Sequence, residues 1–131
     1  MKTFATILAG VALALTGASA SAETLAERGE KRLAEMLEGR TAGTPVSCIS
    51  TPRSNKLDVI EEVGLVYEAG DTIYVSRPSD PKSLDRDDVL VIERFGSQLC
   101  KQDVVRTMDR YQGFINGAVF LGDFVPYKKN G

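Results

Sequence analysis

The first 22 residues decide which part of this chain folds and in what redox environment it does so. Lys2 is followed by an apolar or small stretch over residues 4–15 and then by small residues. A basic start, an apolar centre and an A-x-A pattern are typical of a secretory signal peptide. The A-x-A pattern ends at Ala20 or at Ala22, and we expect cleavage after Ala22, before the polar Glu23.

A membrane anchor is the main alternative for this segment. A helix needs about 20 apolar residues to span a bilayer, and this apolar run is shorter and has no basic flank behind it. No cysteine directly follows the cleavage region, which argues against a lipid anchor. We therefore predict a periplasmic or secreted protein without stable membrane insertion once the signal is removed.

Size and charge narrow the class of the mature protein. Removal of residues 1–22 leaves 109 residues with 15 basic and 18 acidic side chains, a formal charge of −3. A chain of this length forms one domain with a modest core. The acidity argues against a nucleic-acid partner, because nucleic-acid surfaces are usually basic. We predict an amphipathic helix over residues 23–40 and a small β-rich domain over residues 41–131.

The two cysteines, Cys48 and Cys100, lie in the mature part. Thiols of an exported chain usually pair, because the periplasm is oxidising. The bridge would close a loop of about 52 residues and remove about 4 kcal/mol of denatured-state freedom. A redox or zinc role is the alternative, but the pair is not spaced C-x-x-C and the chain has no histidine to complete a zinc site. We predict a structural disulfide.

The helix is predicted from its start and its apolar stripe. Thr24 and Glu27 form a T-x-x-E capping box, and Gly39 is suited to the C-terminal cap. Small and apolar residues then recur at the helical period, which indicates a face that packs on the domain. These residues are Leu25, Ala26, Gly29, Leu33, Met36 and Leu37.

The rest of the mature chain has the short apolar runs and turn residues of a β protein. We expect loops at residues 41–45 and 78–88, and a hairpin whose turn contains Gly70. The apolar run 89–92 is predicted to be an inner strand. The predicted strands cover residues 46–50, 64–68, 72–76, 89–92, 104–108, 114–121 and 124–127. The fold class is α+β, mostly β: one helix followed by a small antiparallel barrel or sandwich with one disulfide.

Several motifs of the mature chain also resemble known sequences. They are PVSCI at 45–49, DTIYVSRP at 71–78, DDVLV at 87–91, SQLC at 97–100 with Asp103, and LGDFVPY at 121–127. Together they resemble a group of small exported proteins of unknown function from alphaproteobacteria, in particular sphingomonad-like ones. The resemblance implies no catalytic residue.

Catalytic and metal motifs are weak. The absence of histidine excludes Ser-His-Asp and Cys-His arrangements and H-E-x-x-H zinc sites. If the neighbours Glu61 and Glu62 were extended, their side chains would point to opposite faces, and we interpret them instead as part of a solvated loop. Catalysis by a carboxylate pair would need both groups in one cleft. We predict no catalytic residue and no cofactor.

An acidic cluster raises the question of calcium. It contains Asp80, Asp85, Asp87 and Asp88, but it lacks the glycine and the closing glutamate of a D-x-[DN]-x-[DN]-G loop. We interpret these residues as turn caps and predict no metal site.

Aromatic residues are the remaining candidates for a ligand groove. In strands they more often form core and cross-strand contacts. The residues are Tyr67, Tyr74, Phe95, Phe114, Phe120, Phe124 and Tyr127.

The favoured function is a non-enzymatic binding or structural protein that binds or shields an envelope protein or polymer. The first alternative is an inhibitor of a lytic enzyme, and a carboxylate-based hydrolase ranks behind it. A protruding loop with an exposed anchor, for example residues 76–88, would favour the inhibitor. A deep cleft with two facing carboxyl groups would favour the enzyme.

Overall fold

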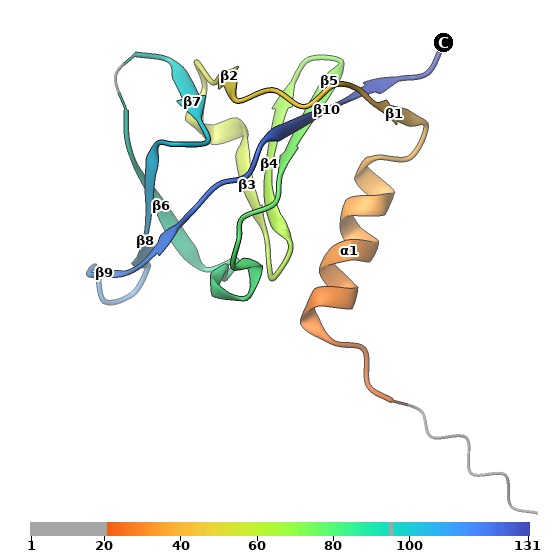
Figure 1. Cartoon of the computed structure of the whole chain (residues 1–131). Coiled ribbons are helices and arrows are strands. Elements are labelled where there is room, and N and C mark those ends of the chain that lie inside the picture. Colours follow the sequence, from red (N-terminus) through yellow and green to blue (C-terminus); the bar gives the residue numbers. More distant parts are fainter. Residues whose placement is uncertain (1–20, 95) are drawn as a thin grey trace, which may run out of the picture.

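The computed structural model describes residues 21–94 and 96–131, with one helix beside a set of antiparallel strands (Figure 1). Residues 1–20 of the predicted signal peptide, which include the first cleavage position at Ala20, lie outside the described residues, and so does Phe95. Ala22 lies in an exposed segment before the helix. No described helix has the length and hydrophobicity that crossing a membrane requires.

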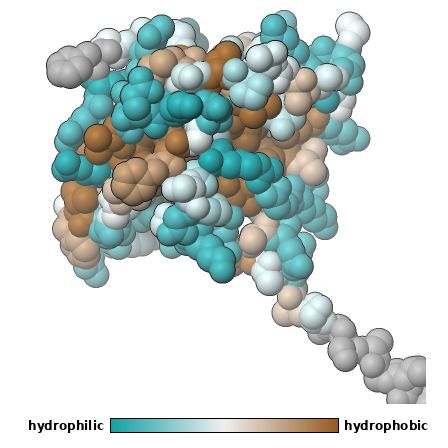
Figure 2. All heavy atoms as spheres, in the orientation of Figure 1, coloured by the Kyte–Doolittle hydropathy of each residue, from teal (hydrophilic) through white to brown (hydrophobic). Residues whose placement is uncertain are grey.

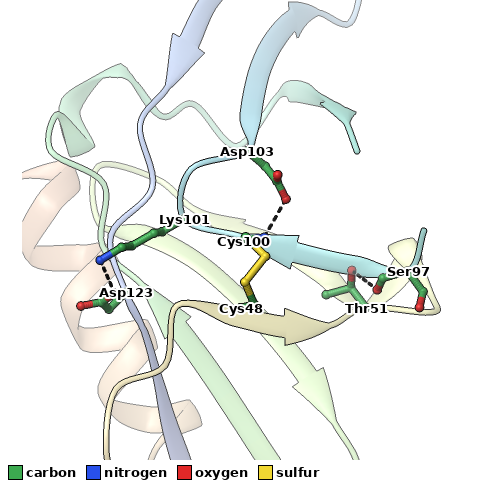
Figure 3. The surroundings of a disulfide bond; sticks show 7 residues. All are labelled: Cys48, Thr51, Ser97, Cys100, Lys101, Asp103 and Asp123. Carbon is green, nitrogen blue, oxygen red and sulfur yellow. Dashed lines mark hydrogen bonds and ion pairs between the residues drawn. A yellow bond between two sulfur atoms is a disulfide. The ribbon is translucent and has the colours of Figure 1, made fainter. Parts of the chain in front are cut away.

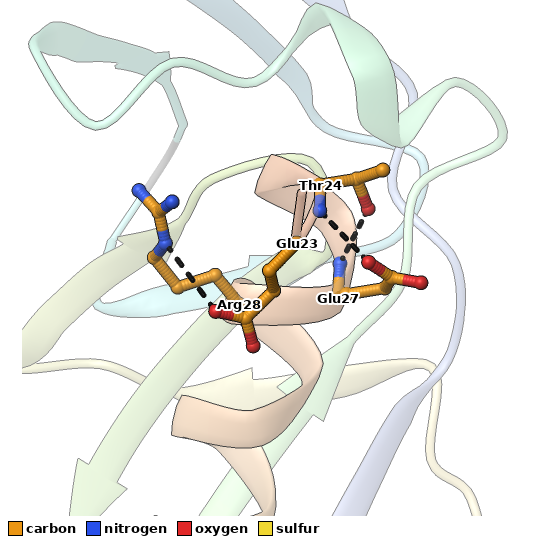
Figure 4. Close-up of polar contacts among 4 residues, drawn as sticks. All are labelled: Glu23, Thr24, Glu27 and Arg28. Atoms are coloured by element: carbon orange, nitrogen blue, oxygen red, sulfur yellow. Dashed lines mark hydrogen bonds and ion pairs between the residues drawn. The ribbon is translucent and has the colours of Figure 1, made fainter. Parts of the chain in front are cut away.

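Helix α1 (Leu25–Met36) begins where the capping box predicts. The Thr24 hydroxyl accepts from the Glu27 backbone N–H at 3.1 Å, and the Thr24 N–H donates to Glu27 Oε2 at 2.8 Å (Figure 4). Arg28 lies 3.9 Å from Glu23 across the same turn. The chain leaves the helix through Gly39 at φ 72°, as expected for a C-terminal glycine. The predicted helix is present, but it is shorter than the expected residues 23–40, because it ends at Met36 and Arg40 already begins β1.

Five strands form the largest sheet, in the order β1-β10-β5-β4-β3, and every neighbouring pair is antiparallel. Its strands are β1 (Arg40–Ala42), β3 (Leu57–Ile60), β4 (Gly64–Ala69), β5 (Thr72–Ser76) and β10 (Phe124–Lys129). The hairpin of β4 and β5 turns at Gly70 with φ 60°, which confirms the predicted turn.

Two smaller sheets complete the fold. One has the order β6-β8-β9, and the other is the pair β2-β7. Their strands are β6 (Asp88–Glu93), β8 (Val104–Asp109), β9 (Ile115–Val119), β2 (Cys48–Ser50) and β7 (Gln98–Cys100), with 3-10 turns η1 (Ser54–Lys56) and η2 (Pro81–Ser83) between strands. The sheets do not close on one another, so the α+β, mostly β fold is a sandwich rather than a barrel.

Three local predictions are wrong. The expected loop at 41–45 contains part of β1, which pairs with β10 from the far end of the chain. The strands β3 and β7 were not predicted, because three or four residues carry too little periodicity. Residues 89–92 lie in β6, which is an edge strand and not an inner one.

The five-stranded sheet has a hydrophobic core on each face. On one face Leu33 of α1 packs with Val66 and Val75. On the other face Leu65 and Phe124 pack with residues from both smaller sheets. Gly29 lets the helix approach closely, because a Cβ at this position would lie 2.6 Å from the Glu61 carbonyl oxygen. The helix and the two smaller sheets therefore pack on opposite faces of the same five-stranded sheet.

Candidate functional site: an apolar hairpin and a strand-edge groove

The predicted disulfide is present and joins β2 to β7 (Figure 3). Cys48 lies directly opposite Cys100 in the antiparallel register. Lys101 donates its N–H to the Ser47 carbonyl at 2.9 Å, so the cysteines occupy the adjacent position without ladder hydrogen bonds. The Cys100 N–H, which points away from β2, is bound by Asp103 Oδ2 at 2.7 Å. The cysteines thus staple a short strand pair, and neither is free.

The strand pair also rests on the core and on the chain before β10. Ile49 and Leu99 form the neighbouring cross-strand pair, and both are buried. Lys101 Nζ lies 2.9 Å from Asp123 Oδ1 on the adjoining segment (Figure 3). The disulfide is therefore part of the scaffold, on the side facing away from the buried pair.

Two carboxylates of the acidic cluster accept hydrogen bonds from the protein itself. Asp85 Oδ1 accepts from the Asp87 N–H at 2.9 Å, as in a capped turn. Asp88 Oδ1 accepts from the Asn116 side-chain amide at 3.3 Å. Within residues 21–94 and 96–131, no three His, Cys, Asp or Glu side chains are grouped as a metal site would require.

The acidic neighbours Glu61 and Glu62 lie in the turn between β3 and β4, in agreement with the expected loop. Glu62 has φ 57°, and its N–H donates to the Leu84 carbonyl at 3.2 Å. That bond ties the turn to the segment before β6. Glu62 therefore helps to fix the backbone of this turn.

The segment 76–88 does not present an exposed apolar anchor. Its only leucine, Leu84, is 2% exposed, and the Ser76 hydroxyl donates to the Gly122 carbonyl at 2.9 Å. The Ser79 N–H donates to the Phe120 carbonyl at 3.1 Å. The segment is held on the body of the domain, which does not favour its use as an inhibitory loop.

The six aromatic candidates that the structure describes fall into three groups, of which one, Tyr74 and Tyr127, is partly buried and packs on the two cores. Tyr67 and Phe124 are buried in the core, as cross-strand packing predicts. Phe114 and Phe120 are exposed and belong to the hairpin of β8 and β9. The aromatic residues therefore do not line one common groove.

Exposed large apolar side chains concentrate on this β8–β9 hairpin. Seven such residues are exposed in the described chain, and five of them are on the hairpin, with Tyr111 at 84% and Phe120 at 71% exposure. We call these five the hairpin surface: Val104, Tyr111, Phe114, Ile115 and Phe120. The other two, Leu25 and Val46, lie elsewhere.

The hairpin tip is held by its own backbone and by one carboxylate. Asp109 Oδ1 accepts from the N–H groups of Tyr111 and Gln112, at 2.8 and 2.6 Å. The Gly113 N–H donates to the Asp109 carbonyl at 2.9 Å, and Gly113 has φ 73°. These bonds hold Tyr111 outward in a defined turn, which lowers the entropy lost when it binds a partner.

The outer face of the three-stranded sheet extends this apolar area. Val105 and Thr107 point into the molecule, so the alternate residues of β8 point outward. An antiparallel sheet with one solvated face normally carries polar residues there. This outer face instead contains Val89, Val91, Val104, Met108, Ile115, Ala118 and Phe120, with the ion pair Arg106–Glu93 as its charged part. Hydrophobic atoms reach the surface over this sheet, at the left of Figure 2.

A groove of about 360 Å³ lies between the edge strands β3 and β6. Leu57, Asp58 and Val59 form one wall, and Asp88, Leu90 and Ile92 form the other. Arg86 and Arg110 also line it. We call this space the β3–β6 groove.

The groove brings two carboxyl groups to opposite walls, but both are already hydrogen-bonded. Asp58 Oδ2 accepts from Arg32 at 2.9 Å, and Asp58 Oδ1 accepts from the Val59 N–H at 2.9 Å. Asp88 accepts from Asn116. These contacts give both carboxylates structural partners, which does not favour their use as an acid–base pair.

The hairpin surface could have been suspected from the sequence, whereas the groove could not. Residues 111–122 contain no charged side chain in a chain that is 26% charged, and this is unusual for solvent-exposed strands. The groove depends on which strands end up as edges of two different sheets.

Comparison with known proteins adds no further assignment: no protein family matches the chain, and no curated protein or solved structure shows significant similarity to it.

Proposed function

We propose that this protein is an exported, non-enzymatic binding domain that attaches to another envelope component through the hairpin surface. One observation carries the proposal: five of the seven exposed large apolar residues of the described chain lie on one hairpin. Contiguous exposed apolar area with aromatic anchors is characteristic of protein interaction sites. The N-terminal signal pattern and the disulfide support an oxidising compartment, periplasmic or secreted.

The energetic argument favours a protein partner over a polysaccharide. Tyr111, Phe114 and Phe120 would each bury a large ring, and aromatic residues dominate interface energetics. The chain has no tryptophan to serve as a flat sugar platform. The charged part of the outer face is a single exposed Arg106–Glu93 pair at 3.7 Å, which contributes little on its own. Shape and apolar area would therefore provide most of the affinity.

The experiment is affinity capture of the mature protein from an envelope extract, followed by binding of the purified captured protein. The double variant Tyr111→Ser/Phe120→Ser is expected to lose the captured partner while its circular dichroism spectrum stays unchanged. The matched control is Leu25→Ser/Val46→Ser, which removes two exposed apolar residues outside the hairpin and should retain the partner.

Either of two results contradicts the proposal. One is a partner that binds both double variants as well as the unaltered protein. The other is a partner that still binds the hairpin variant but no longer binds the control variant. Sequencing the N-terminus of protein from an osmotic-shock fraction tests the export part separately, since cleavage at Ala22 or Ala20 is expected.

Inhibition of a lytic enzyme is the second candidate, and the hairpin tip favours it. Tyr111 is the most exposed of the apolar side chains and stands on a turn fixed by Asp109. A rigid turn with one anchor can enter an enzyme cleft at low entropic cost. Inhibition of a purified peptidoglycan-cleaving enzyme, lost on Tyr111→Ala, would support this role. The similarity to such inhibitors is one of size, disulfide and β content only.

A further inference from the structure

The strand β6 combines an inner-strand sequence with an edge position. Its centre, Val89 to Ile92, contains four apolar residues and no charge, proline or glycine. Such uniform apolar runs are typical of strands that are covered on both faces of their sheet. In the structure β6 pairs with β8 alone. Natural edge strands are usually blocked by charges, proline or bulges, and the ladder between β6 and β8 is regular throughout.

The free backbone groups of β6 point into the β3–β6 groove. The Asp109 N–H donates to the Phe114 carbonyl at 3.0 Å, on the side of β8 away from β6. Because hydrogen bonding alternates along an antiparallel strand, Val89 and Val91 bond to β8. Leu90 and Ile92 therefore direct their N–H and C=O groups away from β8, and both residues line the groove.

The facing strand β3 is blocked by its own side chain. The Val59 N–H donates to Asp58 Oδ1 at 2.9 Å, although Val59 lies on the edge strand. Asp58 is held there by Arg32, whose Nη2 donates to Asp58 Oδ2. A charged side chain over the edge is a device that prevents strand addition. The groove thus has one closed edge, β3, and one open edge, β6.

The floor of the groove is apolar. Leu57, Leu90 and Ile92 are partly buried and pack against the core cluster below. A volume of about 360 Å³ can hold a few apolar side chains from an added strand, whose alternate residues would point down. These side chains would extend the existing core.

Four charged side chains line the groove, and because Asp58 is paired with Arg32, the two arginines outweigh the remaining carboxylate, Asp88. Arg86 and Arg110 line the groove. Among the residues that the structure describes, neither has a carboxylate within 4.0 Å, and Arg110 Nε donates to the Asp87 carbonyl at 3.2 Å. Guanidinium groups without an acidic partner are suited to carboxylates. The groove therefore favours a segment with an acidic side chain or a terminal carboxylate at this end.

We propose that an extended segment of a partner protein, apolar at alternate positions and acidic at one end, adds to the open edge of β6 inside the β3–β6 groove. Strand addition of this kind takes its affinity from main-chain bonds and its specificity from side-chain pockets. None of the five hairpin-surface residues lines this groove, although Arg110 is the neighbour of Tyr111 in the chain.

The test is selection of a random-peptide library displayed on phage against the mature protein. Enriched peptides are expected to alternate apolar residues and to carry aspartate or glutamate at one end. In hydrogen exchange followed by NMR, a selected synthetic peptide should slow exchange of the Leu90 and Ile92 amides. The Val89 and Val91 amides, which already bond to β8, should change little.

The charge part is tested with Arg86→Glu/Arg110→Glu, which should weaken the selected peptide about tenfold. Arg53→Glu/Lys82→Glu makes the same change in net charge at exposed positions outside the groove and should leave affinity unchanged. Selection that yields no peptide, peptides that protect another surface such as β9, equal loss in both double variants, or self-association through β6 would each overturn the proposal.

Discussion

The two faces of the five-stranded sheet are covered in different ways. On one face α1 buries Leu33 against Val66 and Val75, and the cover is complete enough that Gly29 has no room for a side chain. On the other face the small sheets leave a groove beside β6 and an apolar hairpin in solvent. The helix side of the sheet is therefore closely packed, whereas the strand side leaves apolar surface in solvent.

The disulfide stabilises the incompletely covered strand side, because it joins two of its strands covalently. It fixes β2 to β7, two strands of three residues each, which could not hold together through their ladder alone. Their buried pair, Ile49 and Leu99, joins the core that both smaller sheets share. Stability on this side is therefore concentrated in a covalent bond and a small buried pair, and not in complete coverage.

The largest expected effect comes from breaking this bond. Cys48→Ala, Cys100→Ala and the double variant should each lose about 2–5 kcal/mol of unfolding free energy, because the bond closes a loop of 52 residues. Denaturant unfolding of the three variants measures the loss of unfolding free energy. Thiol titration of the unaltered protein under denaturing conditions should find no free thiol. Variants as stable as the unaltered protein, with two titratable thiols, would contradict the structural role and favour redox chemistry.

A pair of truncations compares the two faces directly. Leu33→Ala should cost about 2–5 kcal/mol, because Leu33 is 2% exposed in the core on the helix side. Phe120→Ala removes a larger side chain that is 71% exposed, and should change stability by less than about 0.5 kcal/mol. Thermal and denaturant unfolding measure both. A Phe120 variant as destabilised as the Leu33 variant would show that the hairpin surface is part of the fold and not a binding surface.

Local signals in the sequence were enough for some elements and not for others. The capping box of Thr24 and Glu27 predicted the start of α1, and Gly70 predicted the β4–β5 turn, because both signals act within a few residues. The strands β1, β3 and β7 were missed, because their hydrogen-bond partners are set by the tertiary fold. Arg40, for example, pairs with Lys129.

The candidate sites were harder to predict than the fold. The pairing of Cys48 with Cys100 followed from their number and compartment, but their direct opposition in one ladder did not. The apolar run from Val89 to Ile92 predicted an inner strand, and only the sheet order shows it at an edge. The incorrect prediction is informative, because the pattern of apolar residues reflects the surroundings for which a strand is suited. Those surroundings include contacts that a partner in the groove would provide.

The smallest expected effect concerns the link between the two sides, an ion pair from α1 to the segment after β5. Arg77 Nη2 donates to Glu30 Oε2 at 3.0 Å, and a second bond joins Nη1 to Oε1. The hydrogen bond from Arg77 holds the pKa of Glu30 below its ordinary value of 4.5, against a smaller opposing effect of burial. Because the folded-state pKa is lowered, the pair stabilises the fold above pH 4.5, and this contribution is lost as the pH falls through the folded-state value. Both side chains are about half exposed, so Glu30→Gln should cost less than about 1 kcal/mol of unfolding free energy near neutral pH.

Denaturant unfolding of the variant and the unaltered protein over a pH series should show that the difference in unfolding free energy shrinks on acidification. Arg77→Gln serves as the partner control and should show the same pH dependence. A difference that stays constant with pH would mean that Glu30 acts through packing, and that the two sides of the sheet are not coupled by charge.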